Sequence, residues 1–251
     1  MTEPGTLSDT ELDGAAARLG GAPAGELIAW ALDRFAPERR VVVTGLQAEG
    51  VAVADMAIAL DPGVRVLTID TGRLPEATLR YLDMLRAHWG RNLEVIHPNG
   101  AELDLFSSEH GANPFRESAE LRLECCHIRK VAPLERALRD VDCWMSGLRR
   151  AQSDGRAGTA SIERDPRHRD IVKLNPLAAW SDDEVSAYLR GHHVPEHPLY
   201  ALGYRSIGCD PCTRPVAAGE PVRAGRWWWE DGVDKECGIH ATPRQLAVGG
   251  R

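Results

Sequence analysis

Short runs of aliphatic and β-branched residues alternate with longer amphipathic stretches through the first half of the chain. Four of these runs have the length and composition of buried strands: Arg40–Thr44, Val64–Asp70, Leu93–His97 and Val141–Ser146. Three stretches between them predict helices: Val51–Leu60, Pro75–Trp89 and Glu117–Arg129. This alternation predicts an α/β fold whose mostly parallel sheet is flanked by helices. Ligands of such sheets bind at the carboxyl ends of the strands.

The pattern changes after Gly147. Arg149–Arg169 is rich in charged residues, Gly and Ser, and it predicts a long mobile loop. A short helix follows, in which Ser181 and Glu184 have the spacing of a capping box. Pro and Gly are frequent beyond this helix, and periodicity is weak. We therefore expect one domain over residues 1–222 and a flexible C-terminal tail over residues 223–251.

Composition narrows the classes of function. The 251 residues carry a formal net charge of -7, which argues against general nucleic-acid binding. The N-terminus has no secretory signal pattern, and the longest apolar run, broken by Asp55, is too short to cross a bilayer. We expect a cytoplasmic protein without a nucleic-acid or membrane partner, and we expect it to form a homo-oligomer.

The six cysteines suit metal ligation or catalysis better than disulfides, since the cytoplasm is reducing. Cys209-x-x-Cys212 has the spacing that lets two thiolates bind one metal centre, and Cys125-Cys126 is the only other pair. Adjacent side chains on a regular helix point about 100° apart, so this pair needs a helix end or kink. Pro133 is placed to provide one. Spacing alone leaves a four-cysteine zinc site and a [4Fe–4S] cluster as alternatives.

Several basic residues and one exposed thiol complete the candidate chemistry. Lys130 follows Cys126 by four residues, which places both on one helical face. Cys237 lies in a Gly-flanked tail, where nearby cations would lower its pKa from about 8.5 and favour the nucleophilic thiolate. Cys143, in an apolar stretch, fits an inert buried thiol.

Two strand ends carry turns that suit an anionic ligand. Thr44-Gly45 follows the first predicted strand, and Asp70-Thr71-Gly72 ends the second. Backbone N–H groups of such turns face an incoming phosphate, and the next helix N-terminus favours its charge. Alone this is a weak signal, because any strand-to-helix turn can carry Gly and Thr.

Seven ordered motifs resemble one family, the assimilatory sulfonucleotide reductases, in their cluster-containing adenylyl-sulfate (APS) reductase branch. The motifs are DTGRLPEAT (70–78), ECCHIRKVAPL (124–134), SGLRRAQS (146–153), VKLNPLAAWS (172–181), SIGCDPCTRPV (206–216), RAGRWWWE (223–230) and KECGIH (235–240). The resemblance implies an adenine-nucleotide alpha-hydrolase-like fold related to ATP pyrophosphatases. It also implies reduction of APS to sulfite and AMP by thioredoxin, in sulfate assimilation toward cysteine.

The resemblance assigns roles residue by residue. It implies Cys125, Cys126, Cys209 and Cys212 as ligands of a [4Fe–4S] cluster, and Cys237, His240 and Lys130 as catalytic residues. Substrate contacts are implied at Thr44, Gly45, Asp70, Gly72, Lys130, Gly147, Arg149, Arg156, Arg223, Arg226 and His240.

The chain departs from the family pattern at a few positions. Thr44 replaces the usual serine but keeps the hydroxyl, and Gly50 stands where an acidic or hydroxyl residue is usual. The run DGRAGTAS at residues 154–161 deviates from the family's pattern and leaves the role of Arg156 open. Cys143 matches no family role.

Three rival functions remain in view. Phosphoadenylyl-sulfate (PAPS) reductases share the tail cysteine, but that branch generally lacks the four cluster cysteines. An ATP pyrophosphatase or thiolating enzyme would carry a Ser-Gly-Gly-x-Asp-Ser loop, which TGLQAEG (44–50) does not match. A zinc-stabilised binding module leaves Cys237 unexplained.

Overall fold

A computed structural model describes residues 7–91, 93–230 and 239. The described residues form two compact units. The first unit comprises Met1–Thr68, Glu76–Glu94 and Leu138–Tyr200, and the second comprises Ile69–Pro75, Val95–Ala137 and Ala201–Arg251, each within the described ranges. The predicted division at residues 222 and 223 stays a prediction, because most of the tail lies outside the described residues.

The order of the elements confirms the alternation of strands and helices. The α-helices are α1 (Asp9–Leu19), α2 (Ala24–Arg34), α3 (Ala48–Leu60), α4 (Glu76–Trp89), α5 (Gly100–His110), α6 (Ala119–Cys126), α7 (Ala132–Ala137) and α8 (Asp182–Gly191). The strands are β1 (Arg40–Val43), β2 (Val66–Ile69), β3 (Glu94–Ile96), β4 (Cys143–Met145), β5 (Ile162–Asp165) and β6 (Ile171–Leu174). A π-helix, η3 (His127–Val131), joins α6 to α7.

The six strands form one sheet in the order β3-β2-β1-β4-β6-β5. β1 pairs in parallel with β2 and β4, and β4 pairs in parallel with β6. The pairing of β5 with β6 is antiparallel, and it is the one antiparallel pairing described between strands of this sheet. The predicted mostly parallel sheet is confirmed, and four of its strands lie at the predicted positions.

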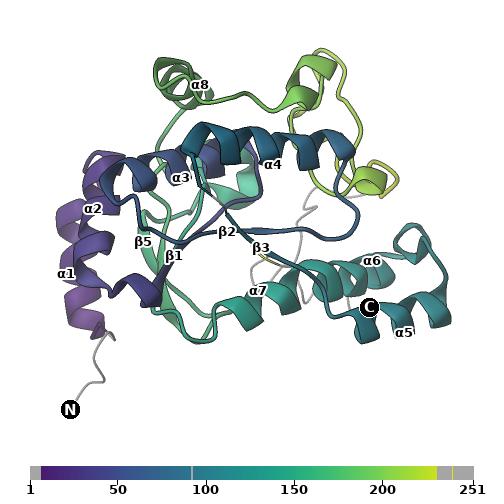
Figure 1. Ribbon diagram of the computed structural model, residues 1–251, viewed down its shortest axis with the longest axis horizontal. Helices are drawn as coiled ribbons and strands as arrows, with labels where there is room; N and C mark the ends of the chain where they lie inside the picture. The colour runs from purple at the N-terminus through teal and green to yellow at the C-terminus, as the bar shows by residue number, and fades with distance from the viewer. Residues whose placement is uncertain (1–6, 92, 231–238, 240–251) are drawn as a thin grey trace. The chain divides into compact units, whose positions relative to one another are not determined.

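Helix α3 occupies the centre of the first unit. It packs on β1, α2 and α8, and Figure 1 shows it beside α4. Val51, Ala52, Val53, Ala54 and Ala57 are fully buried. A helix that is apolar on all sides is stable only when it is covered on all sides, which explains why this segment lacks a polar face. The N-terminus of α3 is thereby held at the carboxyl end of β1.

The prediction of a long mobile loop over Arg149–Arg169 is wrong in part. Strand β5 lies within this range and pairs with β6, with Ile162 opposite Leu174. Two consecutive left-handed residues, Arg169 (φ 58°) and Asp170 (φ 55°), reverse the chain between the strands. β5 is short and three of its four residues are charged, so its hydrophobic pattern is too weak to predict a strand.

The hydrophobic pattern also did not predict helices α1, α2 and α5. α1 begins with a capping box formed by Ser8 and Glu11 and packs on the edge strand β5.

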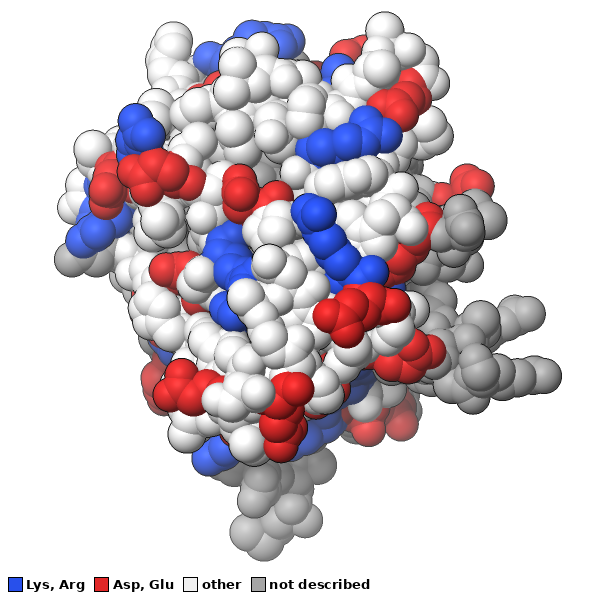
Figure 2. Space-filling view, turned by 90° about the vertical axis from the view of Figure 1, so that its right-hand side faces the viewer, with Lys and Arg blue, Asp and Glu red and all other residues white. Residues whose placement is uncertain are grey.

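Within the described residues, no helix is long and apolar enough to cross a membrane. In the view of Figure 2, Lys and Arg side chains are interspersed with Asp and Glu over the described surface.

Candidate functional site

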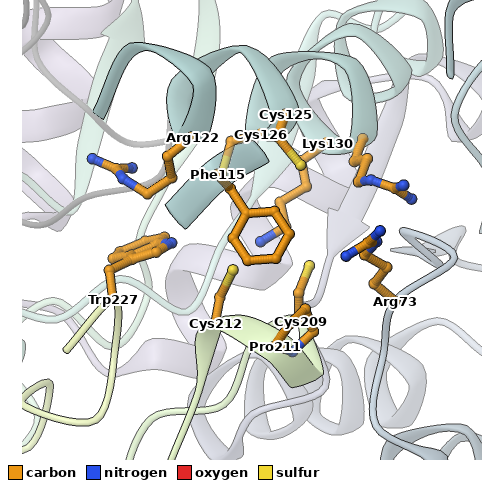
Figure 3. A pocket seen from close by; sticks show the side chains of 11 residues that line it. Arg73, Phe115, Arg122, Cys125, Cys126, Lys130, Cys209, Pro211, Cys212 and Trp227 are labelled. Carbon is orange, nitrogen blue, oxygen red and sulfur yellow. The ribbon is translucent and has the colours of Figure 1, made fainter. Parts of the chain in front are cut away.

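The second unit gathers the four predicted metal ligands into one pocket. Cys125, Cys126, Cys209 and Cys212 are 8%, 6%, 6% and 7% exposed, and all four line one pocket. Figure 3 shows the first pair on one side of the pocket and the second pair on the other, with their sulfur atoms directed inward. Two sequence-distant cysteine pairs therefore meet, as the sequence predicts.

A helix end lets both adjacent cysteines reach the pocket. α6 ends at Cys126, and the chain continues as the π-helix η3, in which the N–H of Ala132 donates to the carbonyl of His127. The wider turn of a π-helix changes the direction of the following side chains, and such turns are frequent at functional sites. The predicted break is confirmed, although the π-turn precedes Pro133, which lies in the first turn of α7.

The second cysteine pair is fixed by a tight turn. The N–H of Cys212 donates to the carbonyl of Cys209 (2.9 Å), and the Thr213 hydroxyl donates to the same carbonyl (3.0 Å). The N–H of Asp210 donates to the carbonyl of Arg73 (2.8 Å). This bond ties the turn to the loop that follows β2.

That loop contains two of the predicted substrate contacts. The N–H of Gly72 donates to the Asp70 carboxylate (2.8 Å), and Gly72 is left-handed (φ 67°). Thr71, between them, places its hydroxyl 3.3 Å from the sulfur of Cys209 and its carbonyl 2.7 Å from the Arg129 guanidinium. The Asp70–Gly72 turn thus lies beside the cysteine pocket, a proximity that the sequence did not predict.

Basic side chains set the charge of the pocket. Lys130 points between the two cysteine pairs (Figure 3). Burial raises the pKa of the Cys209 thiol, but Lys130, the Thr71 hydroxyl and Arg226 outweigh burial and leave that pKa below its ordinary value. Burial and the charge of Cys209 raise the pKa of Cys212 to about 12. Four thiolates in this space therefore need further positive charge among them.

Arg226 is the most distinctive cation of the second unit. It is 5% exposed, and its guanidinium lies over the Trp227 indole, 4.5 Å from the ring centroid. Its Nη1 approaches the Ser206 hydroxyl (3.5 Å) and the Ile207 carbonyl (3.3 Å). Its Nε has no partner, and no carboxylate pairs with it among the described residues. A buried cation without a carboxylate partner among the described residues suits an anionic ligand.

The close approach of Arg226 requires a glycine. A Cβ built on Gly208 would lie 2.3 Å from the guanidinium, so a larger residue there would force the end of the Arg226 side chain to move. Arg223, which is half-buried, begins the turn that ends at Arg226, since its carbonyl accepts the Arg226 N–H (2.9 Å).

The first unit contains the other group of predicted substrate contacts. Thr44, 1% exposed, follows β1, and its hydroxyl accepts the Leu46 N–H (3.0 Å). A Cβ on Gly50 would lie 2.7 Å from that hydroxyl oxygen, and a Cβ on Gly147 would lie 2.4 Å from the Gly50 nitrogen. A side chain at either glycine would meet these neighbours, and the contacts bring the ends of β1 and β4 together at the first turn of α3.

Arg149, unlike Arg226, pairs with carboxylates among the described residues. Its guanidinium donates to the Glu49 carboxylate (2.7 Å), the Asp182 carboxylate and the Trp180 carbonyl (2.9 Å). Two carboxylates therefore compensate this buried cation, which joins α3 to α8. A substrate contact at Arg149 stays a prediction, and a bound anion would have to compete with these partners.

Arg156, the residue left open by the departing loop, donates to the side-chain oxygen of Gln152. Gln152 in turn donates to the Glu49 carboxylate (3.0 Å). Arg156 therefore connects to the network around Arg149, and a substrate contact there stays a prediction.

Two of the remaining predicted residues lie outside the described part of the chain, and Cys143 lies in the core. Cys237 and its neighbour His240 lie outside the described residues, so their roles stay predictions. Cys143 lies in β4, is fully buried, and has a pKa raised by burial. It is therefore an inert core thiol, as its apolar surroundings indicated.

Sequence reasoning missed several residues that line the pocket. The missed residues are Arg73, Phe115 and Arg122, which lie on its wall with the four cysteines, Arg129 and Trp227. The Trp227 indole lies between two guanidiniums, with Arg122 4.6 Å and Arg226 4.5 Å from the ring centroid. Only Arg73 of the three missed residues stands in a quoted motif, because pocket walls built from separate segments leave no local pattern.

Fold and site together define an adenine-nucleotide alpha-hydrolase-like α/β protein with a thiol-lined pocket. A crystal structure of FMN adenylyltransferase from Candida glabrata superposes with a TM-score of 0.53 at 13% identity, over 97% of this chain and 84% of that one. A likeness at this level of identity shows the fold alone.

The chain belongs to the family of the phosphoadenosine phosphosulfate reductase domain, whose family model matches residues 39–215. An adenosine 5'-phosphosulfate reductase of Burkholderia cepacia is 47% identical over 199 residues, which are 79% of each chain. The crystal structure of a PAPS reductase from Candida auris superposes with a TM-score of 0.70 at 27% identity, over 83% of this chain and 98% of that one. These matches confirm the family that the motifs indicated.

Proposed function

We propose that this chain reduces APS to sulfite and AMP with electrons from a thioredoxin-type dithiol, as a step of sulfate assimilation. One observation carries the proposal: a chain of this family gathers four cysteines and Lys130 in a single buried pocket. The name of its Burkholderia cepacia relative supports APS as the nucleotide. The five described cysteines are free thiols, and the cytoplasmic location stays a prediction.

The donor set of the pocket fits the expected [4Fe–4S] cluster. Cys125, Cys126, Cys209 and Cys212 supply only sulfur, which zinc and iron–sulfur clusters both accept. Among the described residues, no three His, Cys, Asp or Glu side chains converge to hold a single metal ion. The ligands of a cluster bind different irons and need not converge on one point. When bound, the cluster would supply the positive charge that four buried thiolates require.

The basic residues around the pocket are suited to the phosphosulfate group of APS. Arg226 is buried without a carboxylate partner in the described part of the chain, and Arg223 starts the same turn. Lys130 carries its charge between the cysteine pairs. Phosphate and sulfate oxygens accept charge-assisted hydrogen bonds from such groups, which are stronger than neutral ones. We assign the sulfate end of APS to these three residues, with His240 as a fourth contact.

The chemical step is a displacement at sulfur. The Cys237 thiolate attacks the sulfate sulfur and forms an S–S bond, while the bond from that sulfur to the bridging oxygen breaks. AMP leaves with the electron pair, and Cys237 carries a thiosulfonate. Preorganised cations offset the charge that an anionic nucleophile meets at an anionic substrate, which is how electrostatic preorganisation lowers such barriers.

The second half-reaction regenerates the thiol. A thiolate of the reductant attacks the Cys237 sulfur, and sulfite leaves with the electron pair of the S–S bond. The second thiol of the reductant resolves the mixed disulfide. The reductant thus becomes a disulfide, sulfur goes from sulfate to sulfite, and Cys237 returns to its starting state.

Parallel steady-state assays with APS and PAPS test the nucleotide assignment. We expect kcat/KM for APS to exceed that for PAPS with thioredoxin as reductant. The structural likeness to the Candida auris PAPS reductase makes PAPS the specific alternative. An equal or higher kcat/KM for PAPS would overturn the assignment to APS.

A further inference from the structure

The loop between β1 and α3 has a strained conformation. Leu46 is left-handed (φ 58°), a conformation that costs energy for a residue with a side chain, and it is 1% exposed. Such strain persists only where the surroundings hold the loop in several ways, and it is concentrated at functional sites. The burial of Leu46 and the hydroxyl of Thr44 on its N–H provide two of these constraints.

A third constraint comes from Tyr200. Ala48 is the first residue of α3, and its N–H is among the donors that a helix cannot satisfy internally. The capping residue Gln47 makes no side-chain cap bond, and the N–H of Ala48 instead donates to the Tyr200 hydroxyl (3.0 Å). This residue lies 152 positions further along the chain. A phenol therefore takes the place of a local cap.

Tyr200 is itself held by an aromatic stack. The His197 ring lies between Tyr200 (5.7 Å between centroids) and Tyr81 (4.7 Å). Nδ1 of His197 accepts the Leu199 N–H (3.2 Å), so Nε2 carries the proton and donates to the Thr78 hydroxyl (3.0 Å). Every polar atom of the buried imidazole is engaged, which fixes the stack in one arrangement.

We propose that Tyr200 is a positioning residue for the nucleotide loop, holding the start of α3 through the N–H of Ala48. The proposal rests on the proposed function, in which the Thr44–Gly45 turn contacts the nucleotide. The hydroxyl accepts the only hydrogen bond described at that N–H. Removing it leaves a donor without an acceptor beside a strained loop, and the loop loses the geometry in which it receives the ligand.

A matched pair of substitutions tests the proposal in the full-length enzyme. Tyr200→Phe removes the hydroxyl on Ala48, whereas Tyr81→Phe removes a hydroxyl that donates to the Pro195 carbonyl (2.8 Å) in the same stack. We expect Tyr200→Phe to raise KM for APS and Kd for AMP by about fivefold or more, with kcat within about twofold of wild type. Tyr81→Phe should lower Tm and leave both constants within about twofold.

A rescue variant separates positioning from direct contact with the ligand. Ala48→Pro removes the orphaned N–H, and proline is favoured at the first position of a helix. Gln47 already has the extended conformation that a following proline requires (φ -98°, ψ 162°). In the Tyr200→Phe background, Ala48→Pro should restore KM and Kd, and its ring would occupy the space of the missing hydroxyl.

Each outcome decides the matter. Unchanged constants in Tyr200→Phe, equal increases in both phenylalanine variants, or failure of Ala48→Pro to restore AMP affinity would overturn the positioning role. Wild-type enzyme that neither turns over APS nor binds AMP would instead overturn the proposed function, whatever Tyr200 does.

Discussion

At the scale of single residues, charge compensation distinguishes two arginines that the motifs rank equally. Arg149 meets two carboxylates, Glu49 and Asp182, and therefore acts as a link between helices. Arg226 packs on Trp227 without a carboxylate partner among the described residues, and therefore retains charge for a ligand. A motif gives the identity of a residue, while its partners decide how much of its charge a substrate can use.

We expect opposite effects on iron content when serine replaces a pocket cysteine and when it replaces Cys143. Cys209→Ser should lose bound iron and sulfide together with activity, because serine oxygen is a poor ligand for a cluster held by four thiolates. Cys143→Ser should retain iron, because this thiol lies in β4, remote from the ligands in sequence and fully buried. Iron and sulfide assays on anaerobically purified protein make the comparison. Equal iron content in the two variants would contradict the ligand assignment.

How far the site could be predicted depends on the range of the interactions. The cysteine pairs were predictable because ligand spacing is a local property of the sequence. The compensation of Arg149 was not predictable, since Glu49 lies 100 residues before it and Asp182 lies 33 residues after it. The contact of Thr71 with Cys209 was not predictable for the same reason, since the two residues are 138 positions apart. The contact of Tyr200 with Ala48 joins residues that are 152 positions apart.

At the scale of elements, interruptions of regular structure place the chemistry. The π-turn after Cys126 separates α6 from α7 and directs Lys130 into the pocket. A hydrophobic pattern predicts that a helix is present over this region, but it does not show where its turn widens. Strand β5 was missed because it is short and mostly charged, so its pairing with β6 leaves no hydrophobic pattern in its own sequence.

The capping box of α8 was predicted from its spacing and is confirmed. Ser181 accepts the Glu184 N–H (3.2 Å), and the Glu184 carboxylate accepts the Ser181 N–H (2.7 Å). Ser181→Ala should lower the free energy of unfolding by about 1 kcal/mol. Ser186→Ala, in the interior of the same helix, should have no such cost, since alanine is the better helix former. Urea unfolding of both variants measures the difference, and equal stability would contradict the capping role.

At the scale of the whole molecule, His197 links stability to pH. Burial lowers the pKa of His197 from 6.5 to about 4 in the folded chain. Between these values the unfolded chain binds a proton that the folded chain does not, so stability falls as pH decreases from 6.5 to about 4. Carboxylates with lowered pKa, such as Asp165, lose their contribution only at lower pH, below their ordinary value of 3.8.

The glutamine variant of His197 isolates this contribution. His197→Gln keeps a donor and an acceptor but cannot titrate. We expect its Tm to fall less than that of the wild type between about pH 7 and pH 4.5, where the imidazole of the unfolded wild type becomes charged. Thermal unfolding across this range provides the measurement. Parallel losses of Tm in the two proteins would show that His197 does not control acid stability.

The central claim is that a thiol of this chain takes the sulfonate group from APS, and single turnover without reductant tests it most directly. We predict that mixing the enzyme with APS releases one AMP per active site and then stops. The protein should gain the mass of one SO₃ group on the peptide containing Cys237, and Cys237→Ser should show neither change while retaining its iron. Absence of AMP release, or an adduct that persists in Cys237→Ser, would contradict the account.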